Sequence, residues 1–356
     1  MDKSFYKNKK ILVTGHTGFK GSWLCELLLL LGADVTGYAL KPPTNPSVFE
    51  LCKLENHIES VTGDVRDLEH LNKVVSEKKP ELIIHMAAQP IVRESYKNPV
   101  YTYDVNVMGT VNILECIRKN ESVRSFLNVT TDKVYKNREL QKPFKEDEEL
   151  NGFDPYSNSK SCSELVTSSY VNSFFTGDGR SIAISTARAG NVIGGGDFAV
   201  DRIIPDCFRA AKKGAVIEVR NPNSIRPYQH VLEPIYVYLT ILQKQYEDLS
   251  FAGSYNVGPD EEDCLTTESL VNGFVSSWKK YTGRETGWTA MSKGGPHEAN
   301  FLKLDCSKLK ERLGWKPEWN ALTAVDKTVS WYADYINGQN MSDVTEKQIS
   351  EFLAGK

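Results

Sequence analysis

The feature that most constrains this chain of 356 residues is a glycine-rich turn near its start. The turn directly follows a short apolar run at 10–14 and opens a helical pattern that continues to Leu31. Its residues are Gly15, His16, Thr17, Gly18, Phe19, Lys20 and Gly21. Glycines at this spacing permit a tight bend, a close backbone approach to phosphate and close packing of helix on strand, and a helix N-terminus offers free N–H groups. The turn therefore predicts a site for the pyrophosphate of a dinucleotide.

Up to about residue 190, short β-rich apolar runs alternate with longer helical patterns. Such alternation indicates a parallel sheet with helices on both faces. We expect strands at 10–14, 34–39, 58–62, 82–85, 125–130 and 181–187, and helices at 21–31, 68–77, 99–119 and 156–173. The predicted fold class is α/β, a doubly wound parallel sheet of the Rossmann type.

The texture of the sequence changes in its second half, where shorter strands (216–219 and 254–257) lie among Gly- and Pro-rich connections and helices. We therefore expect residues 1–187 to form the dinucleotide-binding domain, which also carries the catalytic residues. Residues 188–356 are expected to form mainly a smaller α/β substrate-binding cap, with some segments returning to the Rossmann core. The segment 341–356 is a candidate for a polar helix.

Composition excludes several classes of protein. The 43 Lys and Arg residues nearly balance the 46 Asp and Glu residues, which argues against a nucleic-acid binder. The longest apolar run, Leu27–Leu31, is far shorter than the ~20 residues of a membrane span, and no apolar leader precedes the first strand. We therefore expect a cytoplasmic protein without a membrane partner. Seven widely spaced cysteines without a CxxC pair predict reduced thiols and no metal site. The acidic stretch Glu146–Glu149 is interpreted as a solvated loop.

Two further loops lie where a doubly wound sheet binds its ligand. Asp64 and Val65 follow the third predicted strand, and Ala87, Ala88 and Gln89 follow the fourth. We expect the Asp64 carboxylate to face the adenine and the small residues to lie beside the dinucleotide. The second strand ends without a carboxylate for a ribose 2′-OH, and Lys41 could accept a 2′-phosphate, so this position leaves both NAD and NADP open.

A candidate catalytic set combines a strand end with a helix. Tyr156 and Lys160 lie at i and i+4, on one face of a predicted helix, and Thr131, Asp132 and Lys133 follow the strand at 125–130. An ammonium beside a phenol favours the phenolate and lowers its pKa, which gives a base near neutral pH. Together with the glycine-rich turn, these residues resemble the extended short-chain dehydrogenase/reductase family. The resemblance implies Thr131, Tyr156 and Lys160 as catalytic residues, with Tyr156 and Lys160 also contacting the cofactor.

Four further stretches narrow the resemblance: GHTGFKGSW at 15–23, RAGNVIGGGD at 188–197, IRPYQHV at 225–231 and PHEA at 296–299. Nucleotide-sugar 4,6-dehydratases carry Thr-Asp-Glu or a close variant at the position of Thr131-Asp132-Lys133. Together with this variant, the four stretches resemble the branch of these dehydratases that acts on CDP-glucose. The resemblance spans nearly the whole chain. It implies tightly held NAD, CDP-glucose as substrate, a first step toward deoxysugars of surface polysaccharide such as O-antigen, and a homodimer or homotetramer. The apolar helices after Pro99 and Tyr156 are the expected interface.

The chemistry that this resemblance implies is a redox-neutral cycle. Tyr156 takes the proton of the sugar 4-OH while C4 delivers hydride to NAD⁺. Loss of the C5 proton and of the 6-OH as water then gives a 4-keto-5,6-ene, which takes the hydride back at C6. Asp132 is the implied acid for the departing 6-OH, and Lys133 stands where related dehydratases have a Glu base for C5.

The pair at 132 and 133 raises a physical difficulty. An adjacent ammonium lowers the pKa of an acid Asp, and the carboxylate raises the pKa of a base Lys. If both residues continued the strand, their side chains would point to opposite faces, which weakens this mutual effect. Lys133 therefore stays open as either the base or a residue that positions sugar or cofactor.

The substrate half of the site must neutralise a diphosphate, which Arg binds bidentately. Arg226 and Arg202 are the candidates, although an arginine at a helix start can also be a solvated surface residue. The resemblance adds Asn191 as a substrate contact, and His297 and Glu298 as members of a C-terminal substrate loop, although a lone His is also common as a structural residue.

Three alternative functions follow from the same residues. Another nucleotide-hexose 4,6-dehydratase would use the same catalytic residues, because no residue here distinguishes cytosine from thymine or guanine on physical grounds. A nucleotide-sugar 4-epimerase or reductase would use Thr131, Tyr156 and Lys160 but would not need the pair at 132 and 133. A non-catalytic NAD-sensing regulator would need only the glycine-rich turn and would have no reason to carry Tyr156 and Lys160 at helical spacing. Identification of released NAD, together with assays on nucleotide hexoses, separates these readings.

Overall fold

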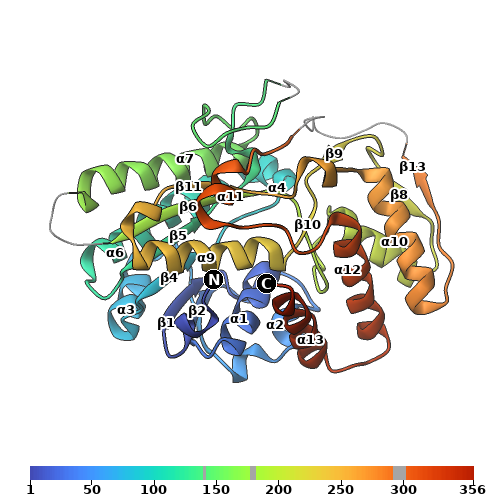
Figure 1. Ribbon diagram of the computed structural model, residues 1–356, viewed down its shortest axis with the longest axis horizontal. Helices are drawn as coiled ribbons and strands as arrows, with labels where there is room; N and C mark the ends of the chain where they lie inside the picture. Colours follow the sequence, from blue (N-terminus) through green and yellow to red (C-terminus); the bar gives the residue numbers. More distant parts are fainter. Residues whose placement is uncertain (139–141, 177–181, 292–301) are drawn as a thin grey trace.

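The computed structural model describes residues 1–138, 142–176, 182–291 and 302–356. In these ranges the main sheet is parallel throughout, with strand order β11-β6-β5-β4-β1-β2-β3. Its strands are β1 (Lys10–Thr14), β2 (Asp34–Ala39), β3 (Glu59–Thr62), β4 (Leu82–His85), β5 (Ser125–Val129), β6 (Ala183–Ala189) and β11 (Ser254–Val257). Helices cover both faces of the sheet (Figure 1), so the predicted fold class is confirmed.

The helices are α1 (Phe19–Leu30), α2 (Val48–Leu51), α3 (Leu68–Lys78), α4 (Val92–Lys97), α5 (Pro99–Tyr103), α6 (Gly109–Lys119), α7 (Pro155–Tyr170), α8 (Ile203–Lys212), α9 (Leu232–Glu247), α10 (Thr267–Thr282), α11 (Ser307–Leu313), α12 (Ala321–Ile336) and α13 (Met341–Ala354). The predicted helix at 99–119 is a run in which a π-helical turn, η3 (Asp104–Met108), separates α5 from α6. A second π-helical turn, η5 (Val171–Phe175), extends α7. The C-terminal segment forms the expected helix, α13.

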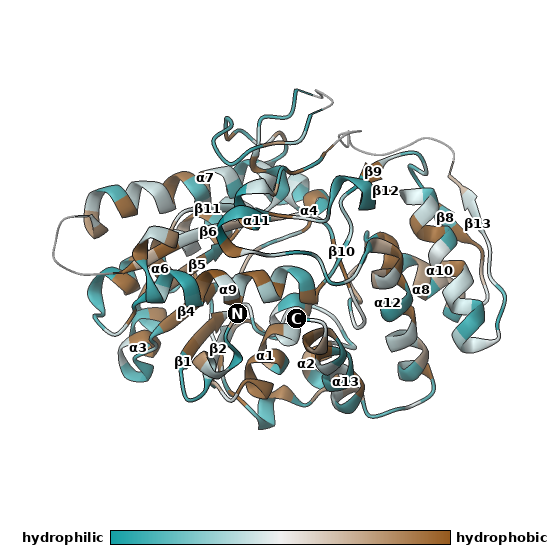
Figure 2. Ribbon diagram, in the orientation of Figure 1, coloured by the Kyte–Doolittle hydropathy of each residue, from teal (hydrophilic) through white to brown (hydrophobic). Residues whose placement is uncertain are grey.

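Alternation along the strands produces two apolar layers, because successive side chains of a strand point to opposite faces. Ile11 and Val13 of β1 belong to the buried cluster that includes α1, α9 and α12, whereas Leu12 belongs to the cluster formed with α3 and α6. Figure 2 shows apolar residues concentrated on the central strands and on α1. This two-sided burial holds the carboxyl ends of β1, β4 and β5 at one edge, where the candidate site lies.

The second half of the chain adds three small strand pairs and a group of helices. The pairs are β8 (Ile217–Val219) with β13 (Trp288–Ala290), β7 (Val192–Ile193) with β10 (Gln229–His230), and β9 (Ile225–Arg226) with β12 (Leu265–Thr266). Helices α8, α10 and α12 pack around them, and the ring of Phe208 stacks on Tyr332 with centroids 4.1 Å apart. These residues belong to the same buried cluster as α1, so the cap and the sheet share one core.

The structure corrects the placement of one strand that we expected in the cap. The strand at 254–257 is not part of the cap: it is β11, which pairs with β6 at the edge of the main sheet. Helix α9 also lies against the sheet, in contact with β5 and β6. Across the described ranges, no helix combines the length and the apolar composition that a bilayer crossing requires.

Candidate functional site

The glycine-rich turn has the geometry of a phosphate cradle. Gly15 has φ +78°, and a Cβ there would lie 2.8 Å from the backbone nitrogen of Ala87. A Cβ on Gly21 would lie 2.2 Å from the Gly15 carbonyl oxygen, so both positions require glycine. By contrast, a Cβ on Gly18 would touch only that carbonyl oxygen, at 3.4 Å, and no side chain caps α1 at this residue. The start of α1 therefore presents backbone N–H groups on an open surface, which fits the diphosphate of NAD.

The side chains of His16 and Thr17 point into the protein. The His16 ring is buried, with Nε2 2.7 Å from the Ser60 hydroxyl, and burial lowers its pKa to about 4. A Cβ on Gly37 would lie 2.3 Å from this ring, so a glycine in β2 makes room for it. The Thr17 hydroxyl donates to the Leu40 carbonyl oxygen at 2.8 Å. At these two predicted cofactor residues, the backbone rather than the side chain is available to contact a ligand.

The Asp64 carboxylate has a partner within its own loop. Arg66 binds it through Nη2 at 2.7 Å and also reaches Asp104 at 3.2 Å. The hydrogen bonds from Arg66 hold the pKa of Asp64 below its usual value. Val65 is buried and packs against Gly109 of α6. The expected contact of this carboxylate with adenine is therefore not preformed.

In the loop after β4, the Gln89 side chain has a structural role, whereas Ala87 and Ala88 remain partly exposed. The Gln89 amide nitrogen donates to the Thr102 hydroxyl at 2.9 Å, and its amide oxygen accepts from the Ile91 N–H at 2.6 Å. Gln89 thus ties this loop to α5. Ala87 and Ala88 stay partly exposed after the end of β4, and the backbone of Ala87 packs closely against Gly15 of the glycine-rich turn.

Residues 131–133 do not continue strand β5. β5 ends at Val129, and Asp132–Val134 form a 3-10 turn, η4, that Thr131 caps. The Thr131 hydroxyl donates to Asp132 Oδ1 at 3.0 Å and accepts from the Lys133 N–H at 3.4 Å. The strand alternation expected for Asp132 and Lys133 is therefore wrong, because a 3-10 turn rotates successive side chains by about a third of a circle.

The Asp132 side chain has the environment of a proton donor. The residue is 1 % exposed, and its Oδ2 has no hydrogen-bond partner among the described residues. Burial raises the pKa of Asp132, while Lys133, a hydrogen bond from Thr131 and the charge of Arg226 oppose this rise. A Cβ on Gly190 would lie 3.2 Å from Oδ2, so the glycine avoids crowding this buried oxygen. Burial is therefore the largest influence on the pKa of Asp132, and it outweighs the opposing charge of the neighbouring Lys133.

Tyr156 and Lys160 lie in the first turns of α7, but the lysine does not bond to the phenol. Lys160 Nζ donates to the Val129 carbonyl oxygen at 3.1 Å, and burial lowers its pKa to about 8. Burial raises the pKa of Tyr156 to about 12, and a hydrogen bond with Thr131 and the charge of Arg202 oppose that rise. The expected lowering of the phenol pKa by Lys160 is thus not present in the protein alone, because the long lysine side chain reaches the end of β5.

Lys20 brings a further cation into the same site. Its Nζ lies 3.3 Å from the Tyr238 hydroxyl of α9, and burial lowers its pKa to about 7. Arg202 and Lys160 lower this pKa further, and Asp132 opposes them. The glycine pattern in the sequence places Lys20 in the turn. It does not predict the contact of Lys20 with Tyr238, because that contact depends on how α9 packs against α1.

The predicted substrate residues lie on the cap side of this cluster. Arg226 is buried near Asp132, and Arg202 is half-buried and pairs with Asp197 at 2.9 Å. The Asn191 carbonyl oxygen accepts from the Gln229 N–H at 3.1 Å, where β7 and β10 begin to pair. His297 and Glu298 lie outside the described residues.

Two buried charges near the site were not predicted as a pair, although Arg188 begins the stretch at 188–197 that supports the resemblance. Glu164 lies one turn after Lys160 on α7, and Arg188 lies near the end of β6; they form an ion pair at 2.9 Å. Their separation in sequence leaves no local pattern that would reveal the pair. In the part of the chain that the structure describes, no group of three or more His, Cys, Asp or Glu side chains could hold a metal ion.

Comparisons with known proteins show which family the chain resembles. Residues 12–328 match the family model described as GDP-mannose 4,6 dehydratase. The chain is 45 % identical to CDP-glucose 4,6-dehydratase of Salmonella typhimurium, over 99 % of both chains, and 29 % identical to a putative UDP-glucose 4-epimerase of Methanocaldococcus jannaschii, over 90 % of this chain and 97 % of the relative. Among solved structures, dTDP-glucose 4,6-dehydratase from Bacillus anthracis in complex with NAD superposes with a TM-score of 0.76 at 21 % identity, over 93 % of this chain and 98 % of the other.

Proposed function

The chain belongs to the GDP-mannose 4,6 dehydratase family, and we propose that it is a cytoplasmic CDP-glucose 4,6-dehydratase with bound NAD. The reaction is the conversion of CDP-glucose to CDP-4-dehydro-6-deoxyglucose and water. The substrate assignment is supported by the 45 % identity to the Salmonella typhimurium enzyme. The observation that carries dehydration is the buried, unpartnered Oδ2 of Asp132 beside Thr131 and Tyr156, because a 4-epimerase needs no such acid.

The residues around the glycine-rich turn fit NAD. The open backbone at Gly18 and the start of α1 would hold the diphosphate, which the positive end of the helix dipole favours. Burial lowers the pKa of Lys20 to about 7 and that of Lys160 to about 8, so these side chains add partial positive charge near neutral pH. When bound there, NAD would supply the hydride acceptor for C4 of the sugar and the hydride donor for C6.

The protein's own groups then divide the proton transfers. Tyr156 takes the proton of the 4-OH, and a hydrogen bond with Thr131 opposes the rise in its pKa that burial causes. Asp132 delivers a proton to the departing 6-OH, which its raised pKa favours. Lys133 is assigned as the base for the C5 proton, and its position in the same 3-10 turn puts it next to the acid.

The cap supplies the diphosphate contacts. Arg226 and Arg202 both lie within electrostatic reach of the catalytic groups, since Arg226 acts on Asp132 and Arg202 acts on Tyr156. We assign them to the substrate diphosphate, with Asn191, His297 and Glu298 as further substrate residues.

The test of this function is a panel of CDP-, dTDP-, UDP- and GDP-hexoses, followed by isotope tracing. CDP-glucose should give the highest kcat/KM, by about tenfold or more. With substrate deuterated at C4, the label should appear at C6 of the product. Label retained at C4 of an epimerised sugar would instead identify a 4-epimerase. Release of NAD from the denatured protein without turnover of any hexose would favour the regulator.

We also propose that the chain forms a homodimer or homotetramer through α5, η3, α7 and η5. Large apolar side chains are exposed along this run: Val100 (82 %), Met108 (46 %), Leu165 (55 %) and Phe174 (42 %). A run of this kind on neighbouring helices suits burial against a second copy.

Leu165→Glu should weaken this assembly about tenfold or more, because a charge would be buried at the interface. Leu322→Glu is the matched control, since Leu322 is a helical leucine with nearly the same exposure, 54 %, on α12. Light scattering over a dilution series measures both. Equal masses for the two variants at every concentration would contradict the proposed interface.

A further inference from the structure

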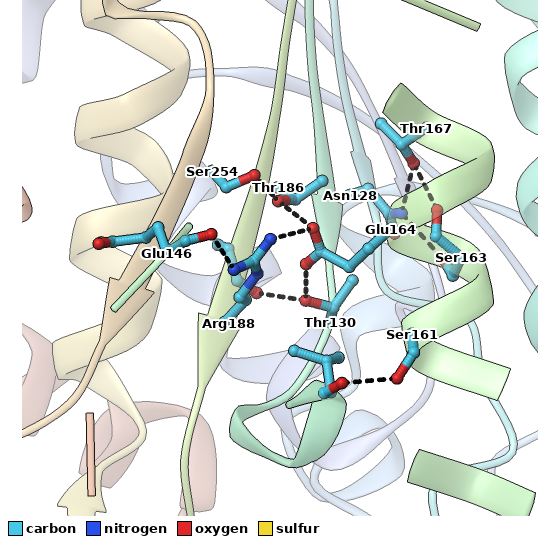
Figure 3. Close-up of polar contacts among 12 residues, drawn as sticks. Asn128, Thr130, Glu146, Ser161, Ser163, Glu164, Thr167, Thr186, Arg188 and Ser254 are labelled. Atoms are coloured by element: carbon cyan, nitrogen blue, oxygen red, sulfur yellow. Dashed lines mark hydrogen bonds and ion pairs between the residues drawn. The ribbon is translucent and has the colours of Figure 1, made fainter. Parts of the chain in front are cut away.

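The buried carboxylate of Glu164 binds three donors from three places in the sequence. Arg188 Nη2 lies 2.9 Å away, the Thr130 hydroxyl 2.5 Å and the Thr186 hydroxyl 2.7 Å. The Glu164 and Arg188 side chains are 2 % and 4 % exposed. Figure 3 shows that these contacts converge between α7 and the carboxyl ends of β5 and β6. No bound ligand is needed to satisfy the carboxylate, because both of its oxygens accept hydrogen bonds.

Such a buried pair is weak support for stability, because the desolvation of two charges offsets most of their attraction. Its placement points to another role. Thr130 immediately precedes Thr131, and Glu164 lies one helical turn beyond Lys160. The Thr130–Glu164 hydrogen bond therefore joins the two elements that carry the catalytic residues.

The same pair also holds the far end of the catalytic turn. Arg188 Nη1 donates to the Tyr135 hydroxyl at 2.8 Å, and Tyr135 directly follows η4. In a separate hydrogen bond, the Ser161 hydroxyl of α7 donates to the Val134 carbonyl oxygen at 2.7 Å. The turn that carries Asp132 is thus fixed on both sides to α7 and β6.

Arg188 extends this arrangement to the acidic loop. Its Nη1 donates to the Glu146 carbonyl oxygen at 2.8 Å, and Glu146 Oε1 accepts from the Asn256 N–H of β11 at 2.9 Å. The interpretation of this loop as merely solvated is therefore wrong for Glu146, although Asp147 and Glu149 are exposed. The loop covers the ion pair and keeps water away from it.

We propose that Glu164 and Arg188 are positioning residues that set the register of Thr131, Asp132 and Lys133 against Tyr156 and Lys160. Thr130 is the contact through which Glu164 acts on the catalytic turn. This inference rests on the proposed function for its kinetic readout. It predicts that loss of the Thr130 hydroxyl misaligns acid and base groups and lowers kcat, with little effect on the diphosphate contacts that determine KM.

The structure offers a matched pair of substitutions. Thr130→Val and Thr186→Val each remove one hydroxyl from the same carboxylate, and both threonines are buried. Both variants should lose similar stability, measured as the melting temperature. Thr130→Val should lower kcat about tenfold or more, because a misplacement of about 1 Å can cost as much as 10²-fold. Thr186→Val should keep kcat and KM within about twofold.

Rescue and an activity-independent measurement complete the test. Thr130→Ser keeps the hydroxyl and should recover most of the lost kcat. Hydrogen exchange of the peptide at 130–136 should speed up in Thr130→Val and not in Thr186→Val. Equal kinetic losses in the two valine variants, or failure of the serine variant to recover, would overturn the proposal. If wild-type protein converts no nucleotide hexose, the proposed function fails, and the exchange comparison still tests the register.

Discussion

Tyr156→Phe should lower turnover by a factor on the order of 10²–10⁴, because the variant lacks the phenolic oxygen that takes the proton from the sugar 4-OH. The substitution removes one hydroxyl and keeps the ring, so the first turns of α7 should pack as before. Bound NAD, released by denaturation and quantified, should be unchanged. Rapid mixing with CDP-glucose should show no reduced cofactor, because the block precedes oxidation at C4.

Tyr103→Phe is the matched control for this substitution. The Tyr103 hydroxyl donates to Asn158 Oδ1 of α7 at 2.9 Å, so its loss also removes a phenolic contact to the same helix. We expect turnover within about twofold of wild type in this control. Oxidation of C4 at a normal rate in Tyr156→Phe would remove this residue from the mechanism.

Asp132→Asn should separate oxidation from elimination. Asparagine keeps the size and the contact with Thr131 but carries no acidic proton, so the 6-OH loses its proton donor. Turnover should fall by about 10²–10⁴ while the oxidised sugar and the reduced cofactor accumulate in a single turnover. Since burial raises the pKa of Asp132, its protonated form, and with it the elimination step, should be lost as pH rises through that pKa.

Lys133→Met is the companion variant, because it tests the neighbouring residue of the same 3-10 turn. It should also stop after oxidation, but exchange of the C5 proton with deuterated water should be lost. In Asp132→Asn that exchange should persist in a stepwise elimination, because deprotonation precedes departure of the 6-OH. Unchanged C5 exchange in Lys133→Met would leave Lys133 as a positioning residue.

The main sheet was predictable because its signals are local. Strands β1, β4 and β5 are short apolar runs that follow a turn and precede a helix, and the predicted bounds of β1, β2 and β4 agree with the structure. β11 was harder to place, because its position beside β6 depends on a return of the chain from the cap. No short-range pattern records such a return.

For the site, the sequence identifies residue types but not their contacts. The spacing of Tyr156 and Lys160 correctly places both on α7, yet the lysine bonds to Val129 on a different element. The strand pattern at 125–130 extends the strand too far, because the cap formed by Thr131 starts a 3-10 turn. The Glu164–Arg188 pair joins a helix to a strand and leaves no periodic signal. The sequence alone does not predict these contacts, because tertiary packing creates them.

The return of β11 to the sheet also matters for synthesis on the ribosome. Until residues 254–257 have emerged, β6 has an open outer edge, with unpaired N–H and C=O groups. Helix α9, which covers β5 and β6, emerges only shortly before β11. A nascent chain that has completed β6 but not β11 therefore exposes both a strand edge and an apolar sheet face, the combination that favours pairing with another chain. The residues between β6 and β11, which include α8 and α9, must be synthesised before that edge can pair. Aggregation of chains stalled or truncated between β6 and β11 is therefore a hazard that the topology itself creates.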